Sequence, residues 1–189
     1  IGFKATAQAT DDLSIGTKIE VQFESNSTAD INQSQNGATI GSNSFTERHL
    51  DLFFSSERFG KLSMGQGSTA SDNTARVDLS GTTVAGNAAV DESADGLSFV
   101  TKGTDSITGN PMIGNVFNEM DGLSRTDRIR YDTPALNGLK AATSWSDGGA
   151  WNAALAYSRK YAGLTVGAGL GFANQSSTST SIESQIDGS

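Results

Sequence analysis

Charged side chains stand at every second position in several stretches of this sequence, and this spacing is the feature best suited to chemistry. Alternate residues of an extended strand point to the same face, so each stretch would line one face with charge. Such a face attracts and orients ions and polar solutes. The positions concerned are Lys4, Lys18, Glu20, Glu47, His49, Asp51, Arg128, Arg130 and Asp132.

Catalytic, cofactor and metal sites find little support in the sequence. His49 is the only histidine and there is no cysteine, so a multi-histidine or thiolate metal site is excluded. Asp91, Glu92 and Asp95 could hold calcium, but their spacing does not match an EF-hand loop. Residues 65–70 fit G-x-G-x-x-A, but a polar stretch follows where a dinucleotide site needs a helix. We therefore expect no enzyme, no cofactor and no metal.

The clearest structural element is the stretch 14–25, SIGTKIEVQFES, in which two kinds of residue alternate. Lysine, glutamate and glutamine occupy the even positions from 18 to 24. The odd positions on the other side hold Ile15, Thr17, Ile19, Val21 and Phe23. A period of two predicts a β-strand with one apolar and one charged face.

The same alternation recurs along most of the chain and predicts about eight antiparallel strands. The further stretches are 1–9, 45–55, 61–67, 126–133, 139–145, 151–157 and 164–172, followed by a polar tail. Asn137-Gly138 is a strong hairpin signal. Connections at one end are all short, whereas the other end carries long polar segments, including 68–125, which has little periodicity.

Composition narrows the class of protein to two all-β architectures. A net charge of −8 and a pI near 4.5 argue against a nucleic-acid partner. A sheet with one apolar and one charged face fits a soluble sandwich, with its core inside, or a membrane barrel, with lipid outside. Aromatic residues near the ends of the apolar faces favour the barrel, because such residues mark membrane interfaces. They are Tyr131, Trp145, Trp151, Tyr157 and Phe172.

Three segments resemble a known family. Residues 1–25 resemble the second and third strands of Gram-negative general-diffusion porins. Residues 45–67, FTERHLDLFFSSERFGKLSMGQG, resemble the next hairpin of that family. Residues 127–145, DRIRYDTPALNGLKAATSW, are similar to the family's "VRYDSP" strand and the strand after it.

The resemblance implies an antiparallel transmembrane β-barrel of roughly sixteen strands. The chain 1–189 would be a single partial barrel domain, an internal fragment supplying about half of those strands. Residues 68–125 would form the constriction loop that folds into the lumen.

The resemblance also assigns roles to charged residues. Arg130 matches the wall arginine of the "VRYDSP" strand, Lys4 lies in the matching "GFK" segment, and Arg128 neighbours Arg130 on one face. Gln66 stands where the family often has arginine. Acids on the loop would face this basic wall; those expected at the constriction are Asp91, Glu92, Asp95, Glu119 and Asp121.

The function that the resemblance implies is a passive channel in the outer membrane of a Gram-negative bacterium. Small hydrophilic solutes and ions would diffuse through a homotrimer surrounded by outer-membrane lipid and lipopolysaccharide. Because acids outnumber bases, we expect mild cation selectivity. The alternative is a secreted or surface β-sandwich that binds carbohydrate or a protein partner.

Overall fold

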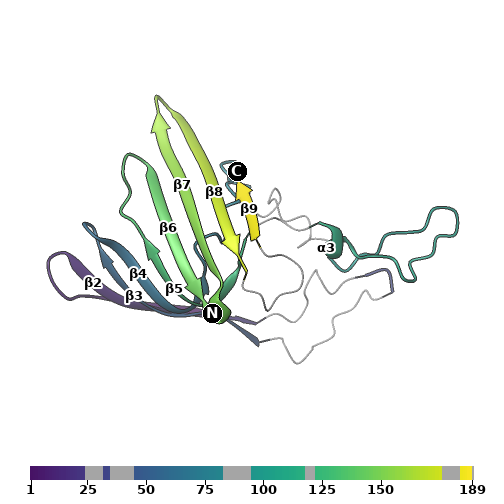
Figure 1. Cartoon of the computed structure of the whole chain (residues 1–189), viewed down its shortest axis with the longest axis horizontal. Coiled ribbons are helices and arrows are strands. Elements are labelled where there is room, and N and C mark those ends of the chain that lie inside the picture. The colour runs from purple at the N-terminus through teal and green to yellow at the C-terminus, as the bar shows by residue number, and fades with distance from the viewer. Residues whose placement is uncertain (24–31, 35–44, 83–94, 118–121, 176–183, 189) are drawn as a thin grey trace.

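The described strands form one antiparallel sheet in which every strand lies beside its neighbour in sequence (Figure 1). The structure, a computed structural model, describes residues 1–23, 32–34, 45–82, 95–117, 122–175 and 184–188. The strands are β1 (Gly2–Gln8), β2 (Leu13–Phe23), β3 (Phe45–Ser56), β4 (Gly60–Ser68), β5 (Arg125–Asp132), β6 (Leu139–Ser146), β7 (Trp151–Tyr161), β8 (Leu164–Asn174) and β9 (Ser184–Gly188).

Eight of these strands confirm the alternation predicted from the sequence. The ninth lies in the segment that we predicted to be a polar tail. β9 pairs with the second half of β8, from Leu170 opposite Gly188 to Asn174 opposite Ser184. Its five residues are too few, and too polar, to show a period of two.

The connections differ at the two ends of the sheet, as the sequence predicts. Four short turns lie at one end, after β1, β3, β5 and β7. Asn137 and Gly138 both have positive φ, 53° and 91°, which is the backbone of the tight hairpin turn that this dipeptide favours. The opposite end carries the segments 24–44 and 69–124.

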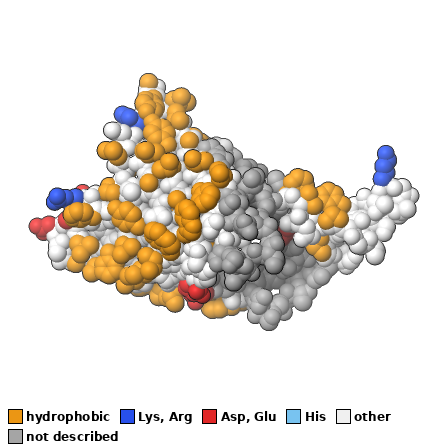
Figure 2. All heavy atoms as spheres, viewed as in Figure 1, with side chains coloured by type: hydrophobic (Ala, Val, Ile, Leu, Met, Phe, Trp, Pro, Cys, Tyr) orange, Lys and Arg blue, Asp and Glu red, His pale blue; other side chains and the backbone are white. Residues whose placement is uncertain are grey.

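The apolar face of the sheet is open to the surroundings. Ile19, Leu50 and Leu155 keep 38%, 50% and 44% of their surface exposed. Figure 2 shows hydrophobic side chains spread over this face. In the described ranges there is a single sheet, so no second sheet packs against these side chains as a β-sandwich would require.

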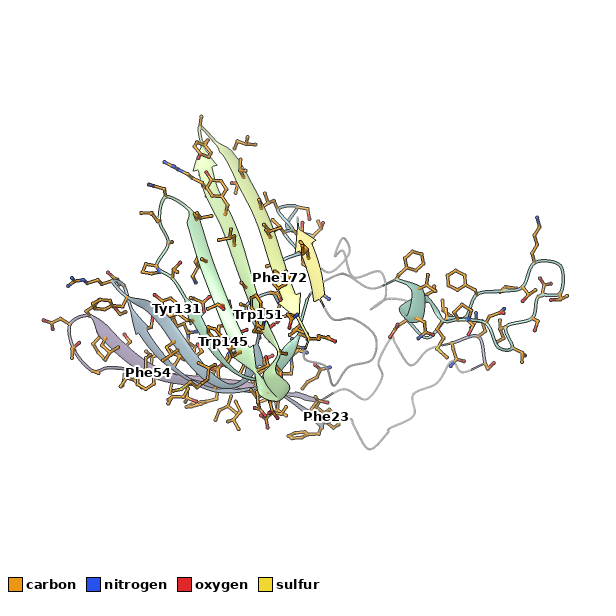
Figure 3. All side chains as sticks on the ribbon, viewed as in Figure 1. Phe23, Phe54, Tyr131, Trp145, Trp151 and Phe172 are labelled. Atoms are coloured by element: carbon orange, nitrogen blue, oxygen red, sulfur yellow. The ribbon has the colours of Figure 1, made fainter. Side chains whose placement is uncertain are left out.

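Aromatic side chains gather toward both ends of the apolar face. Trp151 and Phe172 lie 5.1 Å apart, ring centroid to ring centroid, toward the end with the long connections (Figure 3). Tyr131 lies toward the short turns, where its hydroxyl donates to the Phe59 carbonyl at 2.7 Å. Along β7, the ten residue-to-residue steps from Trp151 to Tyr161 span about 33 Å, or about 23 Å of depth in a strand tilted by about 45°. This depth matches the apolar band of a membrane barrel, about 25 Å tall.

A β-bulge in β3 changes one predicted side-chain direction. Glu20 pairs with His49 but Val21 pairs with Glu47, so Arg48 is the extra residue. Directly paired residues share a face, so Glu47 shares the face of Val21 and not that of His49. Strict alternation had placed Glu47 with His49 and Asp51, and the bulge overturns this placement.

Helical structure is minor in the described ranges. It comprises the single turn α3 (Ile113–Val116) and the 3₁₀ turn η2 (Asp147–Gly149). Neither has the length or the apolar character that a membrane-crossing helix needs. In Figure 1, α3 belongs to a segment that extends away from the sheet.

Replacing Leu155 by arginine tests which medium contacts the apolar face. A cation at the middle of a lipid-facing strand costs about 2–4 kcal/mol, so Leu155→Arg should lower the free energy of unfolding in lipid vesicles by that amount. The measurement is urea unfolding followed by tryptophan fluorescence. Ser158→Arg, on the same strand but on the opposite face, is the matched control and should change stability far less. Equal losses for both variants would contradict hydrocarbon contact at Leu155.

Candidate functional site

The charged face of the sheet contains a groove of about 420 Å³. Strands β1 to β6 contribute to it, because their even- or odd-numbered residues share this face through direct cross-strand pairing. The groove is lined by Lys4, Lys18, His49, Asp51, Phe53, Lys61, Ser63, Ser68, Arg128, Arg130, Asp132 and Lys140. The structure thus brings together seven of the residues singled out from the sequence.

Besides Ser63 and Ser68, three lining residues were not singled out from the sequence: Phe53, Lys61 and Lys140. The alternation held the signal for each. Leu62 and Leu139 were placed on the apolar face, so the adjacent lysines belong to the charged face. Phe54 was also placed on the apolar face, so the adjacent Phe53 belongs to the charged face. An aromatic residue on a charged face was not expected.

Glu20 lies at one side of this groove between two cations. Its carboxylate is 3.0 Å from the Lys18 Nζ and 3.0 Å from the Arg48 Nε. The bulge brings Arg48 to the face of Glu20, and its guanidinium also donates to the Gln22 side chain. Regular alternation would have directed Arg48 to the apolar face, which is why the sequence did not indicate this contact.

Arg128 is buried and fully engaged by the protein. Its Nη2 donates to the Asp51 carboxylate at 2.8 Å, its Nε to the Ser68 carbonyl at 3.0 Å, and its Nη1 to the Gly65 carbonyl at 2.9 Å. The arginine and aspartate side chains are only 4% and 7% exposed. Arg128 therefore ties β5 to the point where the long segment 69–124 leaves β4.

Arg130 lies two residues further along β5 and also binds the backbone at the start of the long segment. Its Nε and Nη2 donate to the two Asp132 oxygens at 3.0 and 2.8 Å, a bidentate pair. Its Nη1 donates to the carbonyls of Ser68 and Thr69 at 3.3 and 2.5 Å. Both predicted wall arginines thus hold the backbone at the start of the long segment.

Strands β6 and β7 hold the next residues of this segment. The Asn152 Oδ1 accepts from the Ala70 amide at 2.8 Å, the Ser71 amide at 3.2 Å and the Ser144 hydroxyl at 2.7 Å. Ser144 and Asn152 have no exposed surface. The segment also returns to the same place, because the Thr69 amide donates to the Ser124 carbonyl at 3.1 Å.

The segment then lies against small residues on the charged face of β8. A Cβ built on Gly167 would be 2.9 Å from the Val77 Cγ1 and 3.6 Å from either Leu79 Cδ. A cavity of about 180 Å³ separates the segment from the wall. Asp72 lines this cavity together with Arg130 and Lys140, so an acid on the segment faces cations on the wall.

Of the predicted loop acids, Asp95 is the one that the structure describes, and it is not at this place. Asp95 lies beside α3, where its carbonyl accepts from the Gly114 amide at 3.2 Å, in the part that extends away from the sheet. Asp91, Glu92, Glu119 and Asp121 lie outside the described residues. Asp72, which the sequence analysis did not select, is the acid that shares a cavity with the basic wall.

The groove is suited to binding ions. In the described part of the chain, no three His, Cys, Asp or Glu side chains gather closely enough to hold a metal ion. Six cations and two carboxylates line the groove. The local charge is therefore positive although the chain as a whole carries −8, so the total charge is a poor guide to what this groove attracts.

Removing Arg128 should be costly because its buried partner would remain charged. We expect Arg128→Met to lower the free energy of unfolding by about 3–5 kcal/mol. In the double variant Arg128→Met/Asp51→Leu no buried charge is left unpaired, so most of the loss should be restored. Urea unfolding of both variants measures the difference. A double variant as unstable as the single one would contradict the assigned ion pair.

Asn152 offers a test of how the long segment is held. Asn152→Ala removes the acceptor of two backbone amides, so hydrogen exchange at Ala70 and Ser71 should accelerate and stability should fall by about 1–3 kcal/mol. Asn152→Asp keeps the accepting Oδ1 and should retain slow exchange at both amides. Unchanged exchange in the alanine variant would show that the segment is held by other contacts.

Comparison with known proteins agrees with these features. No curated protein matches the chain in a sequence search. A family model described as Gram-negative porin matches residues 1–188. That family comprises channels and not enzymes. The match covers essentially the whole chain, and with the single antiparallel sheet, exposed on its apolar face and charged on the other, it shows that the chain belongs to the Gram-negative porins.

Proposed function

We propose that the charged face of this sheet lines a water-filled pore through which small hydrophilic solutes and ions diffuse passively across the outer membrane. The observation that carries this proposal is that the single sheet has an exposed apolar face on one side and a charged face on the other. Leu155 and its neighbours are exposed on one face, and a groove with six cations lies on the other. A wall between lipid and water needs this arrangement.

We propose further that the segment 68–125 narrows the pore. Its first described part, from Thr69 to Leu79, lies on the charged face of β6 to β8, held by Asn152 and Arg130. A segment held on this side of the wall occupies space that would otherwise be open lumen. Cations that line the open groove, such as Lys4 and Lys61, would orient polar solutes.

The remaining barrel and its surroundings are part of the same proposal. β1 and β9 are the edges of the described sheet, and a barrel leaves no edge unpaired. We expect these edges to pair with further strands in a barrel of roughly sixteen. Outer-membrane lipid and lipopolysaccharide would contact the apolar face, and the barrels would associate as a homotrimer, which migration in unheated gels measures.

Liposome swelling tests the channel itself. Vesicles containing the full-length protein should swell in isotonic sugar solutions, and the rate should fall as the sugars become larger. Vesicles with heat-denatured protein are the control. Swelling that does not exceed this control for the smallest sugar would refute the channel.

Gly167 tests whether the long segment sets the width of the passage. A valine at this position would contact Val77 and push the segment away from the wall, so Gly167→Val should lower single-channel conductance in planar bilayers. Gly2→Val is the matched control, because a Cβ there meets only ordinary contacts at 3.8 Å or more. Equal conductance of the two variants would show that residues 77–79 do not border the conducting path.

A further inference from the structure

The cations of the groove divide into those that the protein already neutralises and those that it does not. Arg128 is 2.8 Å from Asp51, and Arg130 forms the bidentate pair with Asp132. The Lys18 ammonium is 3.0 Å from Glu20. These pairs, together with the carbonyl contacts of the arginines, leave those cations little capacity for a solute.

Lys4 and Lys61 have no such partner. Neither ammonium group forms an ion pair with a carboxylate in the part of the chain that the structure describes. Lys140 is intermediate, since it is 3.7 Å from an Asp132 oxygen that Arg130 already uses. Among the described residues, the groove cations that form no ion pair are therefore Lys4 and Lys61.

Both lysines are held over the same aromatic ring. The Lys61 Nζ is 4.6 Å from the centroid of the Phe53 ring, and the Lys4 Nζ is 5.7 Å from it. Cation–π attraction of this kind positions an ammonium group but uses none of its hydrogen-bond donors, so its N–H groups stay available. The two groups thus present donors from two strands, β1 and β4, around one fixed point.

Phe53 is itself fixed by the neighbouring strand. Its side chain is 5% exposed, on a face that is otherwise charged. A Cβ on Gly16, its cross-strand partner, would be 2.3 Å from the Phe53 Cζ, so only glycine leaves room for the ring. The ring therefore packs against β2 at Gly16, and this contact positions it beneath the two lysines.

We propose that Lys4 and Lys61, held on Phe53, form a binding site for a small divalent oxyanion of the hydrogen phosphate type. Two ammonium groups without an ion-pair partner match two negative charges, and their N–H donors match oxygen acceptors. The open groove admits a hydrated anion of this size. The role of this site in transport rests on the channel function proposed above, and it makes the passage prefer anions, opposite to the selectivity predicted from the overall charge.

Binding is tested without reference to conduction. Inorganic phosphate is titrated into the full-length protein in detergent and its ³¹P resonance is followed. The wild type should broaden the resonance saturably, and sulfate should compete. Lys4→Gln and Lys61→Gln should each weaken binding about tenfold or more, because each removes a charged donor. Lys102→Gln removes the same charge from the segment that extends away from the sheet and should bind like the wild type.

A third variant tests the Phe53 ring. Phe53→Leu keeps both lysines but removes the ring, so binding should weaken although the charge of the groove is unchanged. Circular dichroism of every variant confirms that the sheet is intact. Absence of saturable binding by the wild type, or equal binding by Lys4→Gln, Lys61→Gln and Lys102→Gln, would overturn the proposed site.

Planar bilayers separate this proposal from the channel itself. Under a potassium chloride gradient the wild type should give a reversal potential that favours chloride, and added phosphate should lower the chloride current. Lys4→Gln and Lys61→Gln should reduce both effects, whereas Lys102→Gln should not. Phosphate binding without conductance refutes the channel and leaves the site, whereas conductance that is indifferent to both lysines refutes the role of the site in selectivity and leaves the channel.

Discussion

The apolar face of the sheet must contact hydrocarbon and its charged face must contact water, and the rest of the structure depends on this constraint. A residue on a strand belongs to one face or the other by its position alone, because the side-chain period is two. Shifting β7 by one residue would exchange Leu155 for Ala154 or Ala156, and shifting β5 would turn Arg128 and Arg130 toward the apolar side. Hydrocarbon would accept neither arginine, so the register of every strand is specified by the same requirement.

The bulge at Arg48 shows how this requirement is relaxed. It lies near the end of β3 that joins a long connection, where the wall is close to water. There the chain can place Glu47 on the face of Val21 at little cost, because the penalty for a charge falls toward the interface. In exchange Arg48 joins Lys18 beside Glu20.

Most of the sheet could be predicted from the sequence because its pattern is local. Eight strands, the two faces, the Asn137-Gly138 turn and the grouping of Lys4, Arg128 and Arg130 all follow from alternation and turn chemistry. Long-range contacts could not be predicted in this way. Nothing local indicates that both arginines bind Ser68, that Asn152 accepts from Ala70, or that Asp72 faces the wall. β9 was missed because its polar sequence gives no periodic signal. It is a strand because it pairs with β8, which is a contact that the local sequence does not indicate.

The strictly sequential order of the strands has a consequence for how the sheet assembles. Each new strand can join the one made just before it, so no segment has to thread past another, and most steps close a short turn. The longest connection is at the junction of β4 with β5, where residues 69–124 intervene. Closure entropy grows slowly with length, so this step costs only about 3 kcal/mol more than a two-residue turn. The hydrogen bond from Thr69 to Ser124 and the two arginines of β5 act at that same junction. Their contacts offset the entropic cost of closing this connection when β5 pairs with β4.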